Sequence, residues 1–418
     1  MINYLLFFCC LILFAVILQN SKYQLTSPKV LLTSGFMVST LVFAIATSIW
    51  HYEISVATLF YIVISIIVFL SGCHIGFKTK VKRIHEINND IEIGYVSFFI
   101  FMLIILVGIY VRYLVIIELV GRIGEGDLAG LRGEDVTSSY DTYLKFLTPS
   151  ISAICIYAIA YLFSEYRKGT KRYLKSIFII LGYFIYCALS SARIEVIYLF
   201  VYLFVFYSIL INKDKKPKIS LKIMAYMAVF TALGVLAFYG LGYLTGKSQN
   251  QESVFENVAI YTASGIGALD VYLTEFNYSI NNIFTSSFKG VYIFLSYFGL
   301  PFNSSLWTDP NEMNMIMYGD MNHNTNVYTF LRPLVHDYNY IGSLVFVFFE
   351  GWLYTLIYKR AINSSSVRDL WLFLYVYSCP FIFMSSISER FGNVFISMTT
   401  LAFILFIKFS NKVFIKDS

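Results

Sequence analysis

Long apolar stretches separated by short polar segments run along most of the chain. A helix that crosses about 30 Å of hydrocarbon needs roughly 20 predominantly apolar residues, and eleven stretches approach this length. They cover approximately residues 3–19, 30–50, 54–73, 94–117, 144–164, 175–191, 194–211, 223–244, 340–358, 370–387 and 391–410. The pattern predicts an all-α polytopic integral membrane protein with about eleven transmembrane helices, within a range of ten to thirteen.

The composition indicates that the chain is embedded in a lipid bilayer. Of the 418 residues, 58% are hydrophobic and only 13% are charged, whereas a soluble domain carries about 25% charged residues. The first apolar stretch has no basic residues before it and no clear small-residue cleavage site, so we expect a retained helix and not a signal peptide.

Basic residues cluster in alternate short loops. The clusters lie at residues 78–83, 167–172, 213–218, 359–368 and 412–416. Because short cytoplasmic loops collect Lys and Arg, we expect these loops and the C-terminus to be cytoplasmic. Counting helices back from them places the N-terminus outside.

The predicted topology divides the chain into three parts. Residues 1–244 form an N-terminal bundle of about eight helices, residues 245–339 form a long outer loop, and residues 340–418 form a bundle of about three helices. The borderline apolar stretches 257–274 and 288–302 within the loop are expected to be interfacial or re-entrant. A long polar loop on an otherwise short-looped protein is where function is expected.

Arginine is unusually frequent on the predicted outer side. Six Arg residues lie toward it: Arg112, Arg122, Arg132, Arg193, Arg332 and Arg390. They oppose the orientation rule, and Arg presents a rigid fork of donors that matches phosphate. We therefore expect them to converge on an outer cavity that holds a pyrophosphate. The alternative is that some of them pair with nearby acids such as Glu118 or Glu195.

The segment 322–342 concentrates groups suited to proton transfer and sugar binding. His323 titrates near neutral pH and could accept a proton from a sugar hydroxyl. A second set of polar side chains is suited to hydrogen bonding with sugar hydroxyls: Asn324, Thr325, Asn326 and His336. Arg332 and Asp337 follow just before an apolar stretch. A solvent-facing, idle histidine is the alternative for His323.

Two short motifs carry a resemblance to a known family. His323-Asn324, Tyr328, Leu331, Asp337 and Ile341-Gly342 together resemble the outer-loop motif of O-antigen ligases and oligosaccharide repeat-unit polymerases. Residues 189–193, Leu-Ser-Ser-Ala-Arg, resemble the Ser-Arg step that opens an apolar helix in the same families. Here Ala192 separates the Ser from Arg193, which departs from their pattern.

The resemblance implies a glycosyltransferase that polymerises polyprenyl-pyrophosphate-linked repeat units into O-antigen or capsular polysaccharide at the outer leaflet of the inner membrane. On this hypothesis His323, or else Asp337, is the general base. Arg193 and Arg332, helped by Arg122, Arg132 and Arg390, neutralise the departing pyrophosphate. The alternatives are a polysaccharide ligase and a flippase or transporter of the same lipid-linked sugars.

Cofactors and partners follow from the same reading. The cysteines lack the spacing of a metal knuckle, and the paired acids Glu134 and Asp135 lack a spaced metal-binding pattern, so we expect a metal-free site with no cofactor. The expected partners are the lipid-linked oligosaccharides and membrane lipid. A chain-length regulator protein is a further partner that the resemblance implies, and no nucleic-acid partner is expected.

Overall fold

The computed structural model describes most of the helical part of the chain. The described residues are 1–21, 24–81, 93–123, 139–167, 173–189, 194–211, 254–275, 286–288, 290–291, 295, 329–364, 369–388 and 390–413. Within them 88% of residues are helical and none is in a strand. The prediction of an all-α protein is thus confirmed for the described part of the chain.

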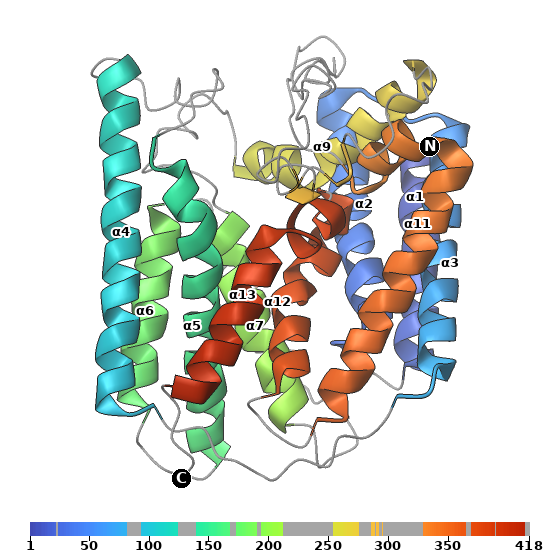
Figure 1. The fold of residues 1–418 in the computed structure, drawn as a ribbon. Helices are drawn as coiled ribbons and strands as arrows, with labels where there is room; N and C mark the ends of the chain where they lie inside the picture. The colour runs from blue at the N-terminus through green and yellow to red at the C-terminus, as the bar shows by residue number, and fades with distance from the viewer. Residues whose placement is uncertain are drawn as a thin grey trace. The chain divides into compact units, whose positions relative to one another are not determined.

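Six of the described helices are long and apolar enough to cross a membrane. They are α1 (Ile2–Asn20), α2 (Pro28–Trp50), α3 (Val56–Lys78), α4 (Tyr95–Ile123), α5 (Asp141–Arg167) and α11 (Leu331–Ile362) (Figure 1). The other helices are α6 (Leu174–Ala188), α7 (Ile194–Ile211), α9 (Val254–Glu275), α12 (Leu370–Phe383) and α13 (Met398–Val413). The protein is therefore of the multi-pass membrane class, while about eleven crossings remain a prediction.

The predicted stretches agree with the helices except in two places: a helical segment precedes residue 340 in α11, and α13 begins at Met398 and not at residue 391. Every stretch but 223–244, which lies outside the described residues, overlaps a helix. Helix α11 begins at Leu331, and the non-helical backbone of Asn339 divides it into residues 331–338 and 340–362, so its apolar part begins at residue 340 as predicted. The first turn accommodates Pro333 because the first amides of a helix need no intrahelical acceptor. A polar segment expected to be loop is thus helical.

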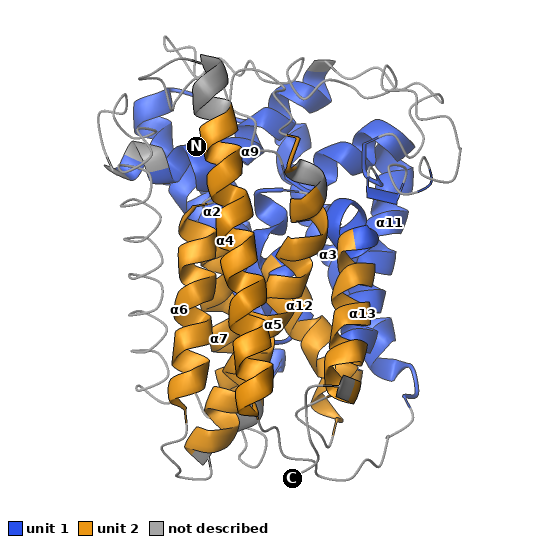
Figure 2. Cartoon of the chain, turned by 60° about the vertical axis from the view of Figure 1, so that its left-hand side comes forward, with its two compact units in different colours: residues 1–82, 253–359, 381–398 blue, residues 83–252, 360–380, 399–418 orange. Residues whose placement is uncertain are grey.

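The chain divides into two compact units. Unit 1 comprises residues 1–82, 253–359 and 381–398, and unit 2 comprises residues 83–252, 360–380 and 399–418 (Figure 2). Each unit combines segments from the early and late parts of the chain. The division into residues 1–244, 245–339 and 340–418 expected from the sequence describes membrane topology and not packing. It stays a prediction.

In unit 1, α1 packs antiparallel to α2. The Asn3 side chain donates to Thr47 Oγ1 at 2.7 Å and to the Tyr52 carbonyl at 2.8 Å, and it accepts from the Ile54 amide at 3.1 Å. Ser27 caps the start of α2 by accepting from Val30 N. One buried amide side chain therefore joins the beginning of α1 to the turn between α2 and α3.

Helices α3 and α11 of unit 1 run parallel and approach closely. Gly72 of α3 lies against the Phe348 carbonyl, and Gly351 of α11 lies against the Phe69 carbonyl. Gly76 continues this surface at a four-residue spacing, the small-xxx-small pattern that lets membrane helices pack backbone to backbone. A side chain larger than hydrogen at either contact would separate the two helices.

The two ends of unit 1 differ in chemistry. At one end Lys359 donates to the carbonyls of Phe77 and Thr79 at 2.8 and 2.6 Å, and Lys29 lies over the Phe77 ring. At the other end lie α9, the first turns of α11 and the π-helical turn Phe391–Phe395 (Figure 1). Basic side chains thus gather at the end of unit 1 opposite to these elements.

In unit 2, α5 is the central helix. Its residues from Ile151 to Ala160 are almost entirely buried, as expected for a helix that is covered on all sides. The Tyr157 ring packs edge-on against Phe373 of α12 at 4.6 Å, and its hydroxyl bonds to Asn411 of α13. Helices α4, α6 and α7 contact α5 or each other around it.

Candidate functional site

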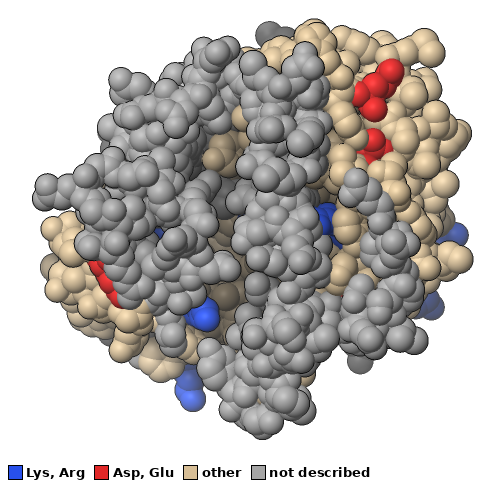
Figure 3. Space-filling model, turned by 90° about the horizontal axis from the view of Figure 1, so that it is seen from above, with Lys and Arg blue, Asp and Glu red and all other residues tan. Residues whose placement is uncertain are grey.

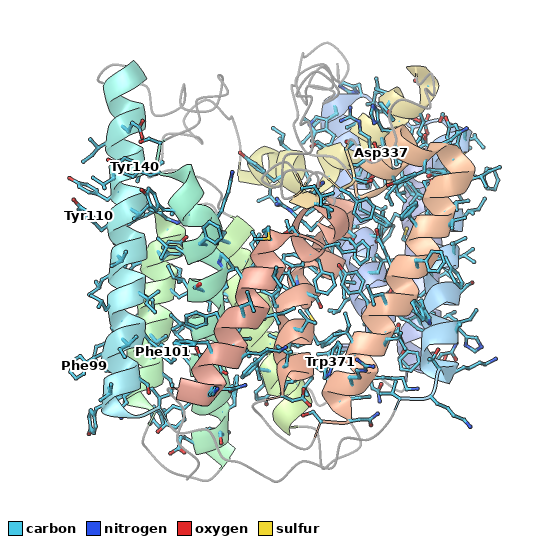
Figure 4. The ribbon with its side chains drawn as sticks, viewed as in Figure 1. Phe99, Phe101, Tyr110, Tyr140, Asp337 and Trp371 are labelled. Atoms are coloured by element: carbon cyan, nitrogen blue, oxygen red, sulfur yellow. The ribbon has the colours of Figure 1, made fainter. Side chains whose placement is uncertain are left out.

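Asp337, near the start of α11, is the best-bound carboxylate described in unit 1. It is fully buried and lies at the end of the unit where α9 is found (Figure 4). It accepts from the Ser286 amide at 3.0 Å, from the Ser287 amide at 2.7 Å and from the Ser287 hydroxyl at 2.6 Å. Such charge-assisted bonds hold a carboxylate firmly in place.

His336 is paired with this carboxylate. Its Nδ1 lies 3.0 Å from Asp337 Oδ1, and the ring is 5% exposed. A carboxylate on one ring nitrogen fixes the orientation of an imidazole and leaves Nε2 as the acceptor nitrogen of the neutral ring. Asp337 therefore orients the His336 ring.

Arg332 lies one turn before His336 on the same face of α11. It is 2% exposed, and its guanidinium stacks on the Tyr272 ring of α9 at 4.6 Å. A cation placed on an aromatic face is stabilised electrostatically, most strongly where water is excluded. Arg332, His336 and Asp337 all lie in the first turns of α11, so a buried cation, a histidine and a carboxylate share one neighbourhood.

The turn that binds Asp337 also packs against the π-helical turn Phe391–Phe395. Asn393 Nδ2 donates to the Ser286 carbonyl at 3.2 Å. Gly392 lies against the Ser287 carbonyl, and a Cβ at Gly290 would lie 2.6 Å from the Asn393 carbonyl. Arg390, whose Nε donates to Ser388 at 2.8 Å, precedes this turn. Single π-helical turns are frequent at functional sites.

The backbone at Asn339 separates the charged segment from the rest of α11. Asn339 has φ 60° and ψ 180°, a region that almost only glycine occupies. Its side chain accepts from the Tyr340 amide at 2.6 Å, and the Tyr340 hydroxyl donates to the Leu273 carbonyl of α9 at 3.0 Å. Such strain costs on the order of 1–3 kcal/mol and clusters at functional sites.

Asp270 of α9 anchors that helix to the turn between α2 and α3. It accepts from the Tyr52 hydroxyl at 2.6 Å, and from the Ser55 hydroxyl and amide at 2.6 and 2.9 Å. This explains why an acid interrupts the apolar stretch 257–274. Asp270 therefore helps to position α9, and with it Tyr272, beside Arg332.

Three of the residues expected from the sequence lie in this network: Arg332, His336 and Asp337. Arg390 precedes the π-helical turn, and its described side-chain hydrogen bond is to Ser388. Three further positions lie outside the described residues, namely Arg132, Arg193 and the run 323–326 with His323, Asn324, Thr325 and Asn326. Arg122 is in α4, but its side chain is likewise outside the described part. The convergence of six Arg residues on one cavity therefore stays a prediction.

Arg112 has an acidic partner, as the alternative reading of the outer Arg residues allowed. In unit 2 its guanidinium bonds to Glu195 at 2.6 Å and stacks on the Tyr186 ring at 4.0 Å. The Tyr186 hydroxyl in turn hydrogen bonds to Thr148 at 2.6 Å. These four residues come from α4, α7, α6 and α5, so their contacts connect the four helices. The charge of Arg112 is paired with Glu195 inside the protein.

Sequence reasoning missed the groups that hold Asp337. The amides of Ser286 and Ser287 reach it from about fifty residues away along the chain, and Tyr272 lies in a different helix. The Ser-Ser pair followed by Gly290 is a turn signal, but a turn signal alone does not indicate an anion-binding turn. Seen from above, the described surface carries a few separated charged side chains (Figure 3).

Comparisons with protein-family models, with curated proteins and with solved structures find no match for this chain. Its function must therefore be inferred from its own residues and their geometry.

Proposed function

We propose that the protein is a membrane-embedded glycosyltransferase that polymerises polyprenyl-pyrophosphate-linked oligosaccharide units. The observation that carries the proposal is the His336–Asp337 pair with the buried Arg332 one turn away. A proton acceptor beside a fixed cation is what glycosyl transfer from a pyrophosphate requires. The resemblance of residues 189–193 and 323–342 to repeat-unit polymerases adds the substrate class.

The reaction forms one bond and breaks one. A sugar hydroxyl of one unit attacks the anomeric carbon of the other, while the bond from that carbon to the pyrophosphate oxygen breaks. The hydroxyl proton passes to His323 or to Nε2 of His336, and the lipid pyrophosphate leaves with the electron pair. Arg332, with Arg193 and Arg390, offsets the charge that develops on it.

Within this proposal, Asp337 acts by positioning His336. Both of its oxygens already accept hydrogen bonds from the turn 286–287 and from the ring, so His336 is the better proton acceptor of the two. His336, which sequence reasoning assigned to sugar binding, thereby becomes a second candidate for the base beside His323.

We further propose that the lysine-rich end of unit 1 faces the cytoplasm and that the end with Asp337 faces outward. The basis is the positive-inside rule applied to Lys29, Lys78, Lys80 and Lys359. An outward site matches lipid-linked donors, because nucleotide sugars are confined to the cytoplasm. It corresponds to an inner-membrane protein whose N-terminus is outside.

The test is the glycan profile of a deletion strain that carries wild-type or variant protein. We expect His336→Gln and Arg332→Met to leave single repeat units on the final acceptor and to remove long chains. A general base contributes about 10²- to 10⁴-fold in rate. His51→Asn is the matched control, since His51 is an exposed histidine in the turn after α2, and long chains should persist.

Other glycan profiles would contradict the proposal and indicate a different function. Long chains stranded on the lipid carrier in the deletion strain would make the protein a ligase. Single units trapped on the cytoplasmic leaflet would make it a transporter. Normal chain lengths in both variants, at protein levels equal to wild type by immunoblot, would exclude His336 and Arg332 from the reaction.

A further inference from the structure

A groove of about 670 Å³ opens in unit 1 among the ends of α1, α2 and α3. Its polar lining consists of Asn20, Ser21, Lys29, Ser71 and His74. None of the described residues that line it is acidic, so no carboxylate among them offsets the positive charge of Lys29. It lies at the lysine-rich end of the unit, away from Asp337, and therefore plays no part in the site described above.

The rest of the lining is apolar and is partly exposed on the outer surface of the helices. Ile17 of α1 and Ile67 and Leu70 of α3 lie nearer the helix middles than the polar residues do, and Ile75 completes the wall. Ile67 and Ile75 are 46% and 48% exposed. In a membrane protein such side chains contact lipid chains. Apart from Ile75, the groove is thus polar toward the helix ends and apolar toward the middles of the helices.

Lys29 sits where an anionic headgroup would bind. It is the second residue of α2, whose N-terminus is capped by Ser27, and its ammonium lies 5.0 Å from the centre of the Phe77 ring. A helix N-terminus adds a partial positive charge. His74 of α3 supplies a further hydrogen-bonding group on the facing wall, whereas the Ser71 hydroxyl, one turn away, donates to the Ile67 carbonyl at 2.9 Å.

We propose that this groove is a specific binding site for an anionic phospholipid. The phosphate lies against Lys29, with His74 as a hydrogen-bond partner, and an acyl chain follows Ile17 and Ile67. Basic pockets between membrane helices on the cytoplasmic side are suited to anionic headgroups. A free phosphate would leave the apolar wall uncovered, and a zwitterionic headgroup would bring a second cation toward Lys29.

The test uses the full-length protein in nanodiscs that contain equal amounts of phosphatidylglycerol and phosphatidylcholine, followed by native mass spectrometry of the lipid that remains bound. We expect the wild type to retain phosphatidylglycerol preferentially. Lys29→Ala should weaken that retention about fivefold, the effect of removing one basic residue near an anionic surface. Ser71→Leu, which fills the groove without changing charge, should weaken it as well.

Lys80→Ala is the matched control, because Lys80 is exposed at the same end but does not line the groove, and retention should be unchanged. The wild type alone suffices if a variant fails to fold. Equal retention of the two lipids, or loss of the bound lipid on adding inorganic phosphate, would overturn the proposal. So would normal retention in both groove variants. None of these results bears on the glycan profile, which tests the transferase.

Discussion

At the scale of single residues, the buried carboxylates Asp337 and Asp270 are each hydrogen bonded by groups from distant parts of the chain. Asp337 is held by a turn that contains Ser286 and Ser287, and Asp270 is held by Tyr52 and Ser55. A buried charge without a partner would cost several kcal/mol. Each of these carboxylates therefore fixes the position of one element against another as well as carrying charge.

The ion pair in unit 2 allows the cost of an unmatched charge to be measured. Glu195→Gln should lower the free energy of unfolding by about 3 kcal/mol, because it leaves the Arg112 guanidinium buried without its counter-charge. Arg112→Met combined with Glu195→Gln should recover most of that loss. The measurement is SDS-induced unfolding in detergent micelles. A double variant as unstable as the sum of the single changes would show that the two side chains act independently.

At the scale of elements, hydrophobic patterning was enough to locate the described apolar helices but not the helical segment 331–338 that precedes Asn339 in α11. The first turns of that helix carry Arg332, His336 and Asp337, which break the apolar pattern. Their partners lie in the turn 286–288 and in α9. Helix formation there depends on tertiary contacts that a local pattern does not contain. The same holds for the site, since residue types were predictable while the contacts that connect them were not.

The close packing of α3 on α11 gives a prediction at this scale. Gly72→Ala should destabilise unit 1 by about 1–3 kcal/mol, because its Cβ would overlap the Phe348 carbonyl and the backbone must move. The measure is again unfolding by SDS. Gly94→Ala is the control, since among the described residues a Cβ there would meet only Ser97 Oγ, at 3.9 Å. Equal stability of the two variants would mean that the helices can separate at little cost.

At the scale of the whole molecule, the two proposed sites lie at opposite ends of unit 1. The lysine-rich end carries the groove proposed for an anionic lipid, and the opposite end carries the His336–Asp337 pair with Arg332. This division has a physical basis, since anionic lipid and the orientation rule both favour Lys on the cytoplasmic side. The outward assignment of the transferase site therefore depends on which end faces the cytoplasm.

Accessibility of engineered cysteines tests that orientation directly. Five of the six native cysteines are buried and Cys9 is partly exposed. A protein with Cys9→Ser should therefore react little with the thiol reagent before a new cysteine is introduced. In right-side-out vesicles, a membrane-impermeant thiol reagent should label Glu53→Cys, in the turn after α2. It should label Lys80→Cys, after α3, only once the vesicles are permeabilised. Glu53 and Lys80 lie at opposite ends of α3, so each variant controls for the other. The reverse pattern would place Asp337 on the cytoplasmic side, where a polymerase of outer-leaflet substrates could not use it, and would favour a cytoplasmic function for the His336–Asp337 pair.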